Sequence, residues 1–310
     1  MSSSPKQKWR SAIKRMNELA MRYLDRVRTI VRSGGPSLLA SRLIRKIQLF
    51  IQKEPYRMLI LRGYFLRNWI EYKGNKELLR KYRIGPRHHS APMPLISVII
   101  PTFNRARILC DRTIPSVLRQ TYHNFELIIV GDHCTDNTQE LIDKFHDKRI
   151  RFLNLEKRGE YPRNPYHRWM VAGTVPVNKG LEIAKGEWIA HLDDDDEFSD
   201  DHLEVLLEIA MENNHELVYG IIEMEVELGK WEHVGSYPPR HSQICRLSAL
   251  YESKLKFFKY DVNCWKYEEP ADWNLWRRME EAGVKIGFVD KVVGKHYLER
   301  TRDQRHEVTL

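Results

Sequence analysis

The chain has 310 residues, of which 42% are hydrophobic and 30% charged, as in globular proteins with one large domain or a domain plus a smaller appendage. It contains no run of about 18 apolar residues, and its N-terminus lacks the apolar core and cleavage site of a signal peptide. The four cysteines lie far apart without C-x-x-C spacing. They therefore argue against a zinc site or a disulfide scaffold and favour a reducing, cytoplasmic setting.

The formal net charge of +9 is concentrated near the N-terminus. Residues 1–94 hold 22 Lys/Arg against 5 Asp/Glu, a balance of +17, whereas the remainder holds 29 against 37, a balance of −8. Apolar residues spaced by three or four predict basic amphipathic helices in the first part, and residues 88–94 have the composition of a linker. We therefore expect a basic helical region over residues 1–94 and a separate domain over residues 95–310.

The basic helices allow two interpretations. Lys/Arg flanks beside faces of Trp, Phe and Leu are typical of helices that attach to an anionic membrane surface. The same pattern fits a helical subdomain that packs on the rest of the chain, with its charges merely solvated. A nucleic-acid-binding role is a third, weaker reading, because the basic surplus is confined to this region and no nucleic-acid-binding motif accompanies it.

After the linker, strand and helix signals alternate. Strands are predicted at residues 95–100, 126–130, 151–155, 187–192 and 285–293, and helices at residues 113–120, 138–145, 201–213 and from 269 onward. This alternation predicts an α/β fold with a mostly parallel sheet and helices on both faces. Ligands bind such sheets at the carboxyl ends of the strands. Thr102, Asp132 and Asp193 each lie just past the end of a predicted strand, so we expect a ligand site there.

The most conspicuous motif is the acidic run Asp193-Asp194-Asp195-Asp196, which follows the predicted strand at residues 187–192. Four adjacent carboxylates raise one another's pKa unless a cation is near. Their oxygens are the ligands preferred by Mg²⁺, Mn²⁺ or Ca²⁺. A solvated acidic turn before the next helix is the alternative, but the position at a strand end favours a metal site.

Three further residues are candidates for chemistry. Asp132 is placed to accept hydrogen bonds from a nucleobase or ribose, although a turn residue is the commoner role for one Asp. Asp272 lies in the first turn of a predicted helix, where the helix dipole would keep it ionised, as a general base requires. A plain N-cap is the alternative. His296 follows the last strand and is either a metal or phosphate ligand or a structural histidine.

The order of the motifs connects these candidates. VIIPTFNR at residues 98–105 is followed by SVLRQTY at 116–122, FELIIVGD at 125–132, NKG at 178–180, AKGE at 184–187 and LDDDD at 192–196. This series resembles the family 2 glycosyltransferases of the GT-A fold over roughly residues 95–298. The resemblance implies a nucleotide-sugar donor and transfer with inversion at the anomeric carbon.

The resemblance also implies roles on the nucleotide side of the site. Pro101 and Thr102 would line the nucleotide pocket, with Arg105 close by. Asp132 would read the nucleobase, which is usually uracil in this family.

On the reaction side, Asp193 and Asp195 would fill the acidic positions of the family's Asp-x-Asp motif. The resemblance makes Asp195 the direct ligand of Mn²⁺ or Mg²⁺, with Asp193 its partner toward the nucleotide and Asp194 a solvated neighbour. Asp272 matches the catalytic base of inverting members. His296 matches a histidine near the metal and diphosphate.

The chain departs from the family pattern at several positions. Gly131 and His133 flank Asp132 in place of an acidic residue and a glycine or asparagine, which leaves base recognition open. Ala271 stands where an acidic residue often precedes the base. The loop expected over residues 156–176 is longer than usual and rich in arginine and aromatic residues, and it either holds the diphosphate or acceptor or is a variable surface loop.

The expected function is transfer of a sugar from a UDP-sugar to a hydroxyl of a glycan or lipid-linked acceptor in polysaccharide biosynthesis, with a divalent metal. We expect the protein in the cytoplasm, peripheral on the cytoplasmic face of a membrane if the basic region binds lipid. A sugar nucleotidyltransferase is the main alternative, but no glycine-rich loop with a lysine follows the first strand to hold a triphosphate. The second alternative is a non-catalytic, basic protein that binds nucleic acid.

Overall fold

The computed structural model describes residues 63, 66–67, 70–84 and 93–298. The chain forms two compact units, residues 1–63 and residues 64–310. The amphipathic helices predicted before residue 62 and the linker predicted at residues 88–92 lie outside the described residues. The sheet and the helices that cover it belong to the second unit.

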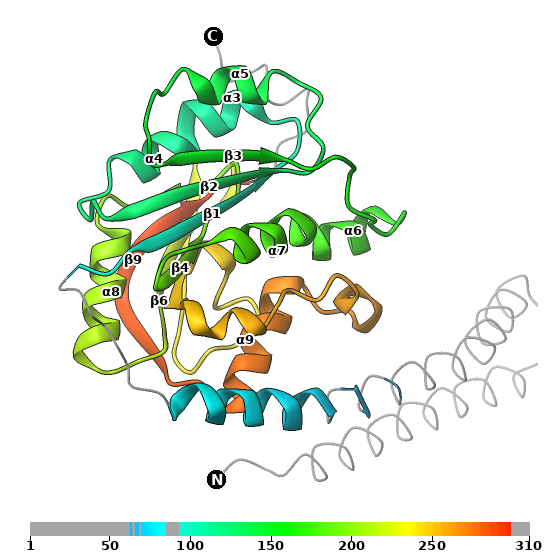
Figure 1. The fold of residues 1–310 in the computed structure, drawn as a ribbon, viewed down its shortest axis with the longest axis vertical. Coiled ribbons are helices and arrows are strands. Elements are labelled where there is room, and N and C mark those ends of the chain that lie inside the picture. Colours follow the sequence, from blue (N-terminus) through cyan, green and yellow to red (C-terminus); the bar gives the residue numbers. More distant parts are fainter. Residues whose placement is uncertain (1–62, 64–65, 68–69, 85–92, 299–310) are drawn as a thin grey trace, which may run out of the picture. The chain divides into compact units, whose positions relative to one another are not determined.

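Nine strands in the described part of the chain form one sheet, in the order β3-β2-β1-β4-β8-β6-β9-β5, with β7 beside β6 (Figure 1). Their bounds are β1 Ile96–Thr102, β2 Phe125–Gly131, β3 Ile150–Asn154, β4 Trp188–His191, β5 Glu197–Phe198, β6 Leu217–Glu227, β7 Lys230–Val234, β8 Ala249–Glu252 and β9 Ile286–His296. The predicted strands correspond to β1, β2, β3, β4 and β9.

The sheet divides into a parallel part and a mixed part. Strands β3, β2, β1 and β4 are parallel neighbours, and β6 pairs in parallel with β9. Strand β8 is antiparallel to both β4 and β6, while β5 and β7 are antiparallel to β9 and β6. The predicted α/β class is confirmed. The parallel order extends over the four strands that carry the expected site, and the antiparallel pairings belong to the other half.

Alternating side chains of the strands build two apolar cores, one on each face of the sheet. From β1, Ile99 enters one core, and Val98 and Ile100 enter the other. Helices α7 and α9 supply the first core, and α4, α5 and α8 supply the second (Figure 1). The predicted cover of helices on both faces is therefore present.

The helices have these bounds: α3 Ala106–Ile108, α4 Ile114–Leu118, α5 Thr138–Asp143, α6 Pro165–Val171, α7 Thr174–Ile183, α8 His202–Glu212 and α9 Ala271–Ala282. A π-helical turn, η1 (Leu109–Thr113), joins α3 to α4, and three 3₁₀ turns are η2 Arg246–Ser248, η3 Ser253–Phe257 and η4 Cys264–Tyr267. The predicted helices correspond to α4, α5, α8 and α9. In α9, the apolar residues Leu275, Met279 and Ala282, spaced by three or four, are buried.

A helix over residues 70–83 packs on this unit, although it belongs to the region predicted as a separate basic segment. Leu79 is only 2% exposed and joins the core of α7 and α9. Arg83 binds both carboxylate oxygens of Glu216, at 2.8 and 2.6 Å, and the ring of Tyr82 stacks on Phe257. This segment is thus part of the second unit, which begins at residue 64 rather than at residue 95. Among the described residues, no helix has the length and apolar content needed to cross a bilayer.

Candidate active site

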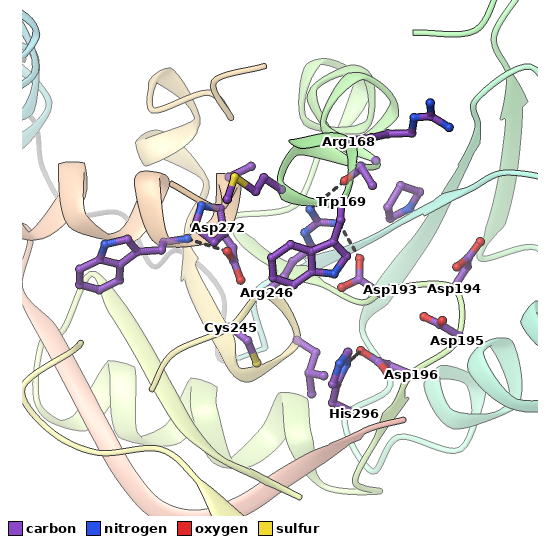
Figure 2. Close-up of a pocket in the computed structure, with 18 of the residues that line it drawn as sticks. Arg168, Trp169, Asp193, Asp194, Asp195, Asp196, Cys245, Arg246, Asp272 and His296 are labelled. Carbon is purple, nitrogen blue, oxygen red and sulfur yellow. Dashed lines mark hydrogen bonds and ion pairs between the residues drawn. The ribbon is translucent and has the colours of Figure 1, made fainter. Parts of the chain in front are cut away.

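The predicted site residues gather around one cleft of about 810 Å³. It lies at the carboxyl ends of β1, β2 and β4, as expected for this type of sheet. The predicted residues that line it are Pro101, Thr102, Arg105, Asp132, Asp193, Asp195, Asp272 and His296. Figure 2 shows the four consecutive carboxylates, Asp272 and His296 around this cleft.

Asp194 is a structural anchor, and the prediction that it is a solvated neighbour is wrong. Its carboxylate accepts a hydrogen bond from the Thr102 hydroxyl at 2.7 Å and one from Arg105 Nη1 at 3.1 Å. The side chain is buried, and burial raises the pKa of Asp194 to about 7 against the opposing charge of Arg105. Asp194 therefore ties the turn after β4 to the end of β1.

Asp195 points into the cleft and shares Arg105 with Asp194. Its Oδ2 lies 2.5 Å from Arg105 Nη1, and 18% of its side chain is exposed. Arg105, which lines the cleft, thus binds the acidic run itself. A ligand that reaches Asp195 would meet both a carboxylate and a cation.

Asp196 is fully buried and fixes the last strand against the acidic run. Its Oδ2 lies 2.9 Å from His296 Nδ1, and its Oδ1 accepts a hydrogen bond from the Tyr297 amide at 3.1 Å. Burial raises the pKa of Asp196 to about 7, although the hydrogen bond from His296 opposes it. Burial lowers the pKa of His296, but the hydrogen bond and charge of Asp196 outweigh this and raise it to about 9. His296 is therefore a cation beside the acidic run at neutral pH.

Asp193 is paired with an arginine from a distant part of the chain. Arg246, in η2, donates from Nη1 to Asp193 Oδ1 at 2.5 Å (Figure 2). Its Nη2 lies 3.4 Å from the carbonyl oxygen of Ala172, at the end of α6, and its guanidinium lies 5.3 Å from the ring centroid of Tyr260. Only 8% of Arg246 is exposed, so a buried cation borders the cleft behind Asp193.

Asp272 lies in the first turn of α9, and its Oδ1 accepts a hydrogen bond from the Trp273 amide at 2.7 Å. Burial raises the pKa of Asp272 above its usual value, although the charge of Arg246 lowers it. The prediction that this carboxyl is ionised rested on the helix dipole, whereas desolvation is the largest influence on its pKa. A carboxylate with a raised pKa is a better proton acceptor near neutral pH than an ordinary one.

Asp132 lies at the end of β2, 4% exposed, with its backbone amide bonded to the carbonyl of Thr102 at 2.8 Å. Its Oδ1 accepts a hydrogen bond from the Gly159 amide at 2.8 Å, and Arg158 Nε lies 3.9 Å from its Oδ2. The Arg158 guanidinium covers the ring of Phe103 at 3.6 Å. One carboxylate oxygen thus holds the following loop, and an arginine borders the other.

The segment predicted as a loop over residues 156–176 is helical in part, which corrects that prediction. It contains α6 and the start of α7, joined through Gly173. Gly173 has a positive φ of 71°, and a Cβ there would lie 3.1 Å from the Pro101 side chain. This close approach places α6 beside the end of β1, so the segment forms one wall of the cleft.

The chemistry of the acidic run fits a hard divalent cation, since its donors are carboxylate oxygens. In the described part of the chain, no three His, Cys, Asp or Glu side chains are grouped to enclose a metal by themselves. Mg²⁺ and similar ions are commonly held by one or two carboxylates together with substrate phosphates and water. A site with Asp195 as its main protein ligand is therefore compatible with this arrangement.

Of the cleft residues, Arg246 escaped the sequence analysis, whereas Arg158 and Trp169 belong to the segment 156–176, which was expected to hold the diphosphate or acceptor or to be a surface loop. Arg158 and Trp169 lie in the segment rich in arginine and aromatic residues, where the pattern alone distinguishes no single residue from its neighbours. Arg246 is a single arginine within the otherwise mostly apolar stretch from Ile244 to Tyr251, and a lone cation in such a stretch is the signal that marks it.

Known proteins resemble this chain in sequence and in fold. The family model "Glycosyl transferase family 2" matches residues 97–265. A Campylobacter jejuni GalNAc(5)-diNAcBac-PP-undecaprenol beta-1,3-glucosyltransferase is 34% identical over 51% of this chain and 48% of its own. The chain spans between 36% and 48% of the length of the curated relatives it matches.

Two solved structures share the fold. S. aureus TarS 1–349, in complex with UDP-GlcNAc, superposes with a TM-score of 0.54 at 17% identity, over 67% of this chain and 59% of that one. The mannosyltransferase PcManGT from Pyrobaculum calidifontis, in complex with GDP-Man and Mn²⁺, gives 0.50 at 14% identity, over 80% and 70%. The family match covers more than half of the chain, and the sheet carries its carboxylates where this fold binds ligands. The chain belongs to the family 2 glycosyltransferases and has the GT-A type of fold.

Proposed function

We propose that this glycosyltransferase moves a sugar from a UDP-sugar to a hydroxyl of a glycan or lipid-linked acceptor, in one step that inverts the anomeric carbon. The observation that carries the proposal is the placement of Asp272, a carboxyl with a raised pKa, in the same cleft as the acidic run. The leaving diphosphate needs a group that stabilises its charge, and the attacking hydroxyl needs a base. The two groups must lie on opposite sides of the same sugar.

In the proposed reaction Asp272 accepts the proton of the acceptor hydroxyl. The hydroxyl oxygen forms a bond to the anomeric carbon while the bond from that carbon to the diphosphate oxygen breaks. The charge of Arg246 opposes the rise of the Asp272 pKa and so favours the ionised form of the base. Oxygen enters opposite the leaving group, and this accounts for inversion.

Asp195 and Asp193 would hold a divalent cation together with the diphosphate of the donor. When bound, the cation supplies charge neutralisation and a template for the leaving nucleoside diphosphate. Arg105, which already contacts Asp195, and the protonated His296 add positive charge on the same side of the cleft. The Pyrobaculum mannosyltransferase, which was solved in complex with Mn²⁺, supports this choice of ion.

The nucleobase is assigned to the end of β2. A carboxylate such as Asp132 accepts a hydrogen bond from the uracil N3–H group, and Phe103 and Arg158 provide flat surfaces beside it. The UDP-GlcNAc complex of TarS supports uracil, whereas the Pyrobaculum protein was solved with GDP-Man. The identity of the donor base is therefore the first property to measure.

The proposal of a glycan or lipid-linked acceptor is supported by the names of relatives and by the positive charge of residues 1–94. The Campylobacter relative is named for an undecaprenol-diphosphate substrate, which is membrane-bound. The surplus of +17 in residues 1–94 suits contact with an anionic lipid surface. The full-length protein should sediment with vesicles that contain phosphatidylglycerol and stay in solution with neutral phosphatidylcholine vesicles. Equal sedimentation with both would refute attachment through anionic lipid, and no sedimentation with either would refute lipid attachment.

A donor screen tests the central proposal. Release of nucleoside diphosphate is measured with UDP-, GDP- and TDP-sugars, with Mn²⁺ or with a chelator. We expect release from a UDP-sugar that requires the metal. Formation of pyrophosphate from UTP and a sugar 1-phosphate would instead identify the alternative function, a sugar nucleotidyltransferase.

A further inference from the structure

The short helix α6 buries one face and exposes two aromatic rings on the other. Met170 and Val171 are 4% and 1% exposed, whereas Tyr166 and Trp169 are 59% and 60% exposed. The two exposed rings lie 6.3 Å apart between centroids, with an interplanar angle of 18°. Both line the cleft that contains the acidic run and Asp272.

The inner side of α6 is anchored to the segment that leads to the proposed base. The His167 ring lies 5.0 Å from the Trp265 ring, and its Nε2 lies 3.5 Å from a carboxylate oxygen of Glu268. Glu268 ends η4 and is followed closely by Pro270, the N-cap of α9, and then by Asp272. The exposed rings are therefore held on the side of the cleft where the hydroxyl would lose its proton.

The other end of α6 is tied to the acidic run. Arg246, which binds Asp193, also contacts the carbonyl oxygen of Ala172 at the C-cap of α6. Figure 2 shows Trp169 among the residues that line the cleft, while Arg168 points away from the carboxylates. Arg168 instead donates to the carbonyls of Pro162 and Arg163, at 3.2 and 3.1 Å, and braces the start of the helix.

The exposure of these rings is not needed for folding. The helix is stabilised by its buried residues and by its N-cap, Asn164, whose Oδ1 accepts hydrogen bonds from the Tyr166 and His167 amides. Polar side chains at positions 166 and 169 would serve the helix as well and would avoid presenting apolar surface to water. A pair of exposed aromatic rings beside a polar cleft is typical of a binding surface.

We propose that Trp169 and Tyr166 form a platform for a pyranose ring of the acceptor, an inference that rests on the proposed function. The C–H groups on one face of a pyranose form a flat apolar surface that packs on an aromatic ring, while its hydroxyls remain free for polar partners. The donor nucleotide is assigned to the ends of β1 and β2. The platform, on the side of Asp272, is placed for the sugar that supplies the attacking hydroxyl.

Saturation-transfer NMR tests the platform without turnover. The probes are the methyl β-pyranosides of glucose, galactose, N-acetylglucosamine and N-acetylgalactosamine, added to the full-length protein with UDP and Mg²⁺. At least one should bind, and Trp169→Ala should weaken it about tenfold, the effect of losing roughly 1.4 kcal/mol of ring contact. Trp169→Phe should keep part of the affinity. Tyr237→Ala serves as the control, because Tyr237 is 61% exposed but does not line the cleft.

The affinity for UDP, measured by calorimetry in the same variants, separates this inference from the proposed function. Unchanged UDP binding together with weaker glycoside binding in Trp169→Ala supports the platform. Glycoside binding that is absent, or equal in wild type and Trp169→Ala, overturns it while UDP binding and donor turnover still support the proposed function. Glycoside binding that depends on Trp169 in a protein that turns over no nucleotide sugar would leave the platform standing and refute the function.

Discussion

Arg246 and Asp193 form an ion pair with 2.5 Å between Nη1 and Oδ1, and this pair connects the acidic run to the proposed base. The positive charge of Arg246 acts on Asp272 as well, where it lowers a pKa that burial raises. One buried guanidinium therefore serves a carboxylate on the leaving-group side and another on the acceptor side. Substitution of Arg246 tests whether the same guanidinium affects both Asp193 and the proposed base Asp272.

Replacement of Arg246 should change the pH dependence of the reaction. In Arg246→Met the charge that lowers the Asp272 pKa is lost, so that pKa rises. A base must be ionised to act, so the acid limb of the kcat profile should move to higher pH. Arg246→Lys keeps the charge and should leave the limb close to its wild-type position. An unmoved limb in Arg246→Met would contradict the link between Arg246 and the base.

Loss of the base itself should affect turnover more than donor binding. Asp272→Asn keeps the size of the side chain but cannot accept the proton, so kcat should fall roughly 100- to 10,000-fold. The affinity for the UDP-sugar, measured by calorimetry, should remain close to that of the wild type. Glu281→Gln, an exposed carboxylate on the same helix, is the control. Near-normal turnover in Asp272→Asn would rule out its role as the base.

Asp195 should determine how donor binding depends on metal. In Asp195→Ala the proposed metal ligand is removed, so added Mn²⁺ should no longer strengthen UDP binding in a calorimetric titration. Asp111→Ala is a matched control, because Asp111 also pairs with an arginine but lies on the surface with 67% of its side chain exposed. If Mn²⁺ strengthens UDP binding equally in both variants, the assignment of Asp195 fails.

The elements that could be predicted from the sequence are those with a local signal. Strand β1 is a continuous apolar run, and α8 repeats apolar residues at helical spacing, so each stands out in its own segment. Strand β8 has four residues, all buried between β4 and β6, and its sequence has no alternation. Its structure depends on partners distant in the chain, which a local pattern does not reveal.

The site residues also differ in whether a local sequence signal predicts their position. The strand-end rule located Asp132 and the acidic run, because every parallel strand ends at the same edge. The inward turn of Asp194 toward Thr102 and the pairing of Asp193 with Arg246, 53 residues away, depend on how separate segments meet. The raised pKa of Asp272 likewise comes from burial within the folded cleft, which its position in a helix does not reveal.

The helix over residues 70–83 should contribute to the stability of the catalytic domain. Leu79→Ala removes a side chain that is 2% exposed and should lower the free energy of unfolding by about 2–4 kcal/mol. Its neighbour Leu78 is 38% exposed, so Leu78→Ala should change that free energy by no more than about 0.5 kcal/mol. Urea unfolding of both variants gives the comparison. Equal small effects would show that the helix does not pack on the domain in solution.

His202 should make the fold sensitive to acid. The ring is buried against Phe198, its Nδ1 lies 2.7 Å from the carbonyl oxygen of Val293, and its Nε2 has no hydrogen-bond partner among the described residues. Burial lowers the pKa of His202 to about 4, although the bond to Val293 opposes this. Between pH 6.5 and 4 the unfolded chain therefore binds the proton more readily, and stability falls as the pH falls, by about 3 kcal/mol from this group.

The variant His202→Phe isolates this effect. It retains the ring stacked on Phe198, and the Val293 carbonyl still accepts a hydrogen bond from the Ser199 amide at 3.1 Å. Because phenylalanine does not titrate, the variant should lose less stability than the wild type when urea unfolding is compared at pH 7 and pH 4. Equal losses in the two proteins would mean that His202 is not the group that charges on unfolding. The acid sensitivity would then have to come from other titrating groups.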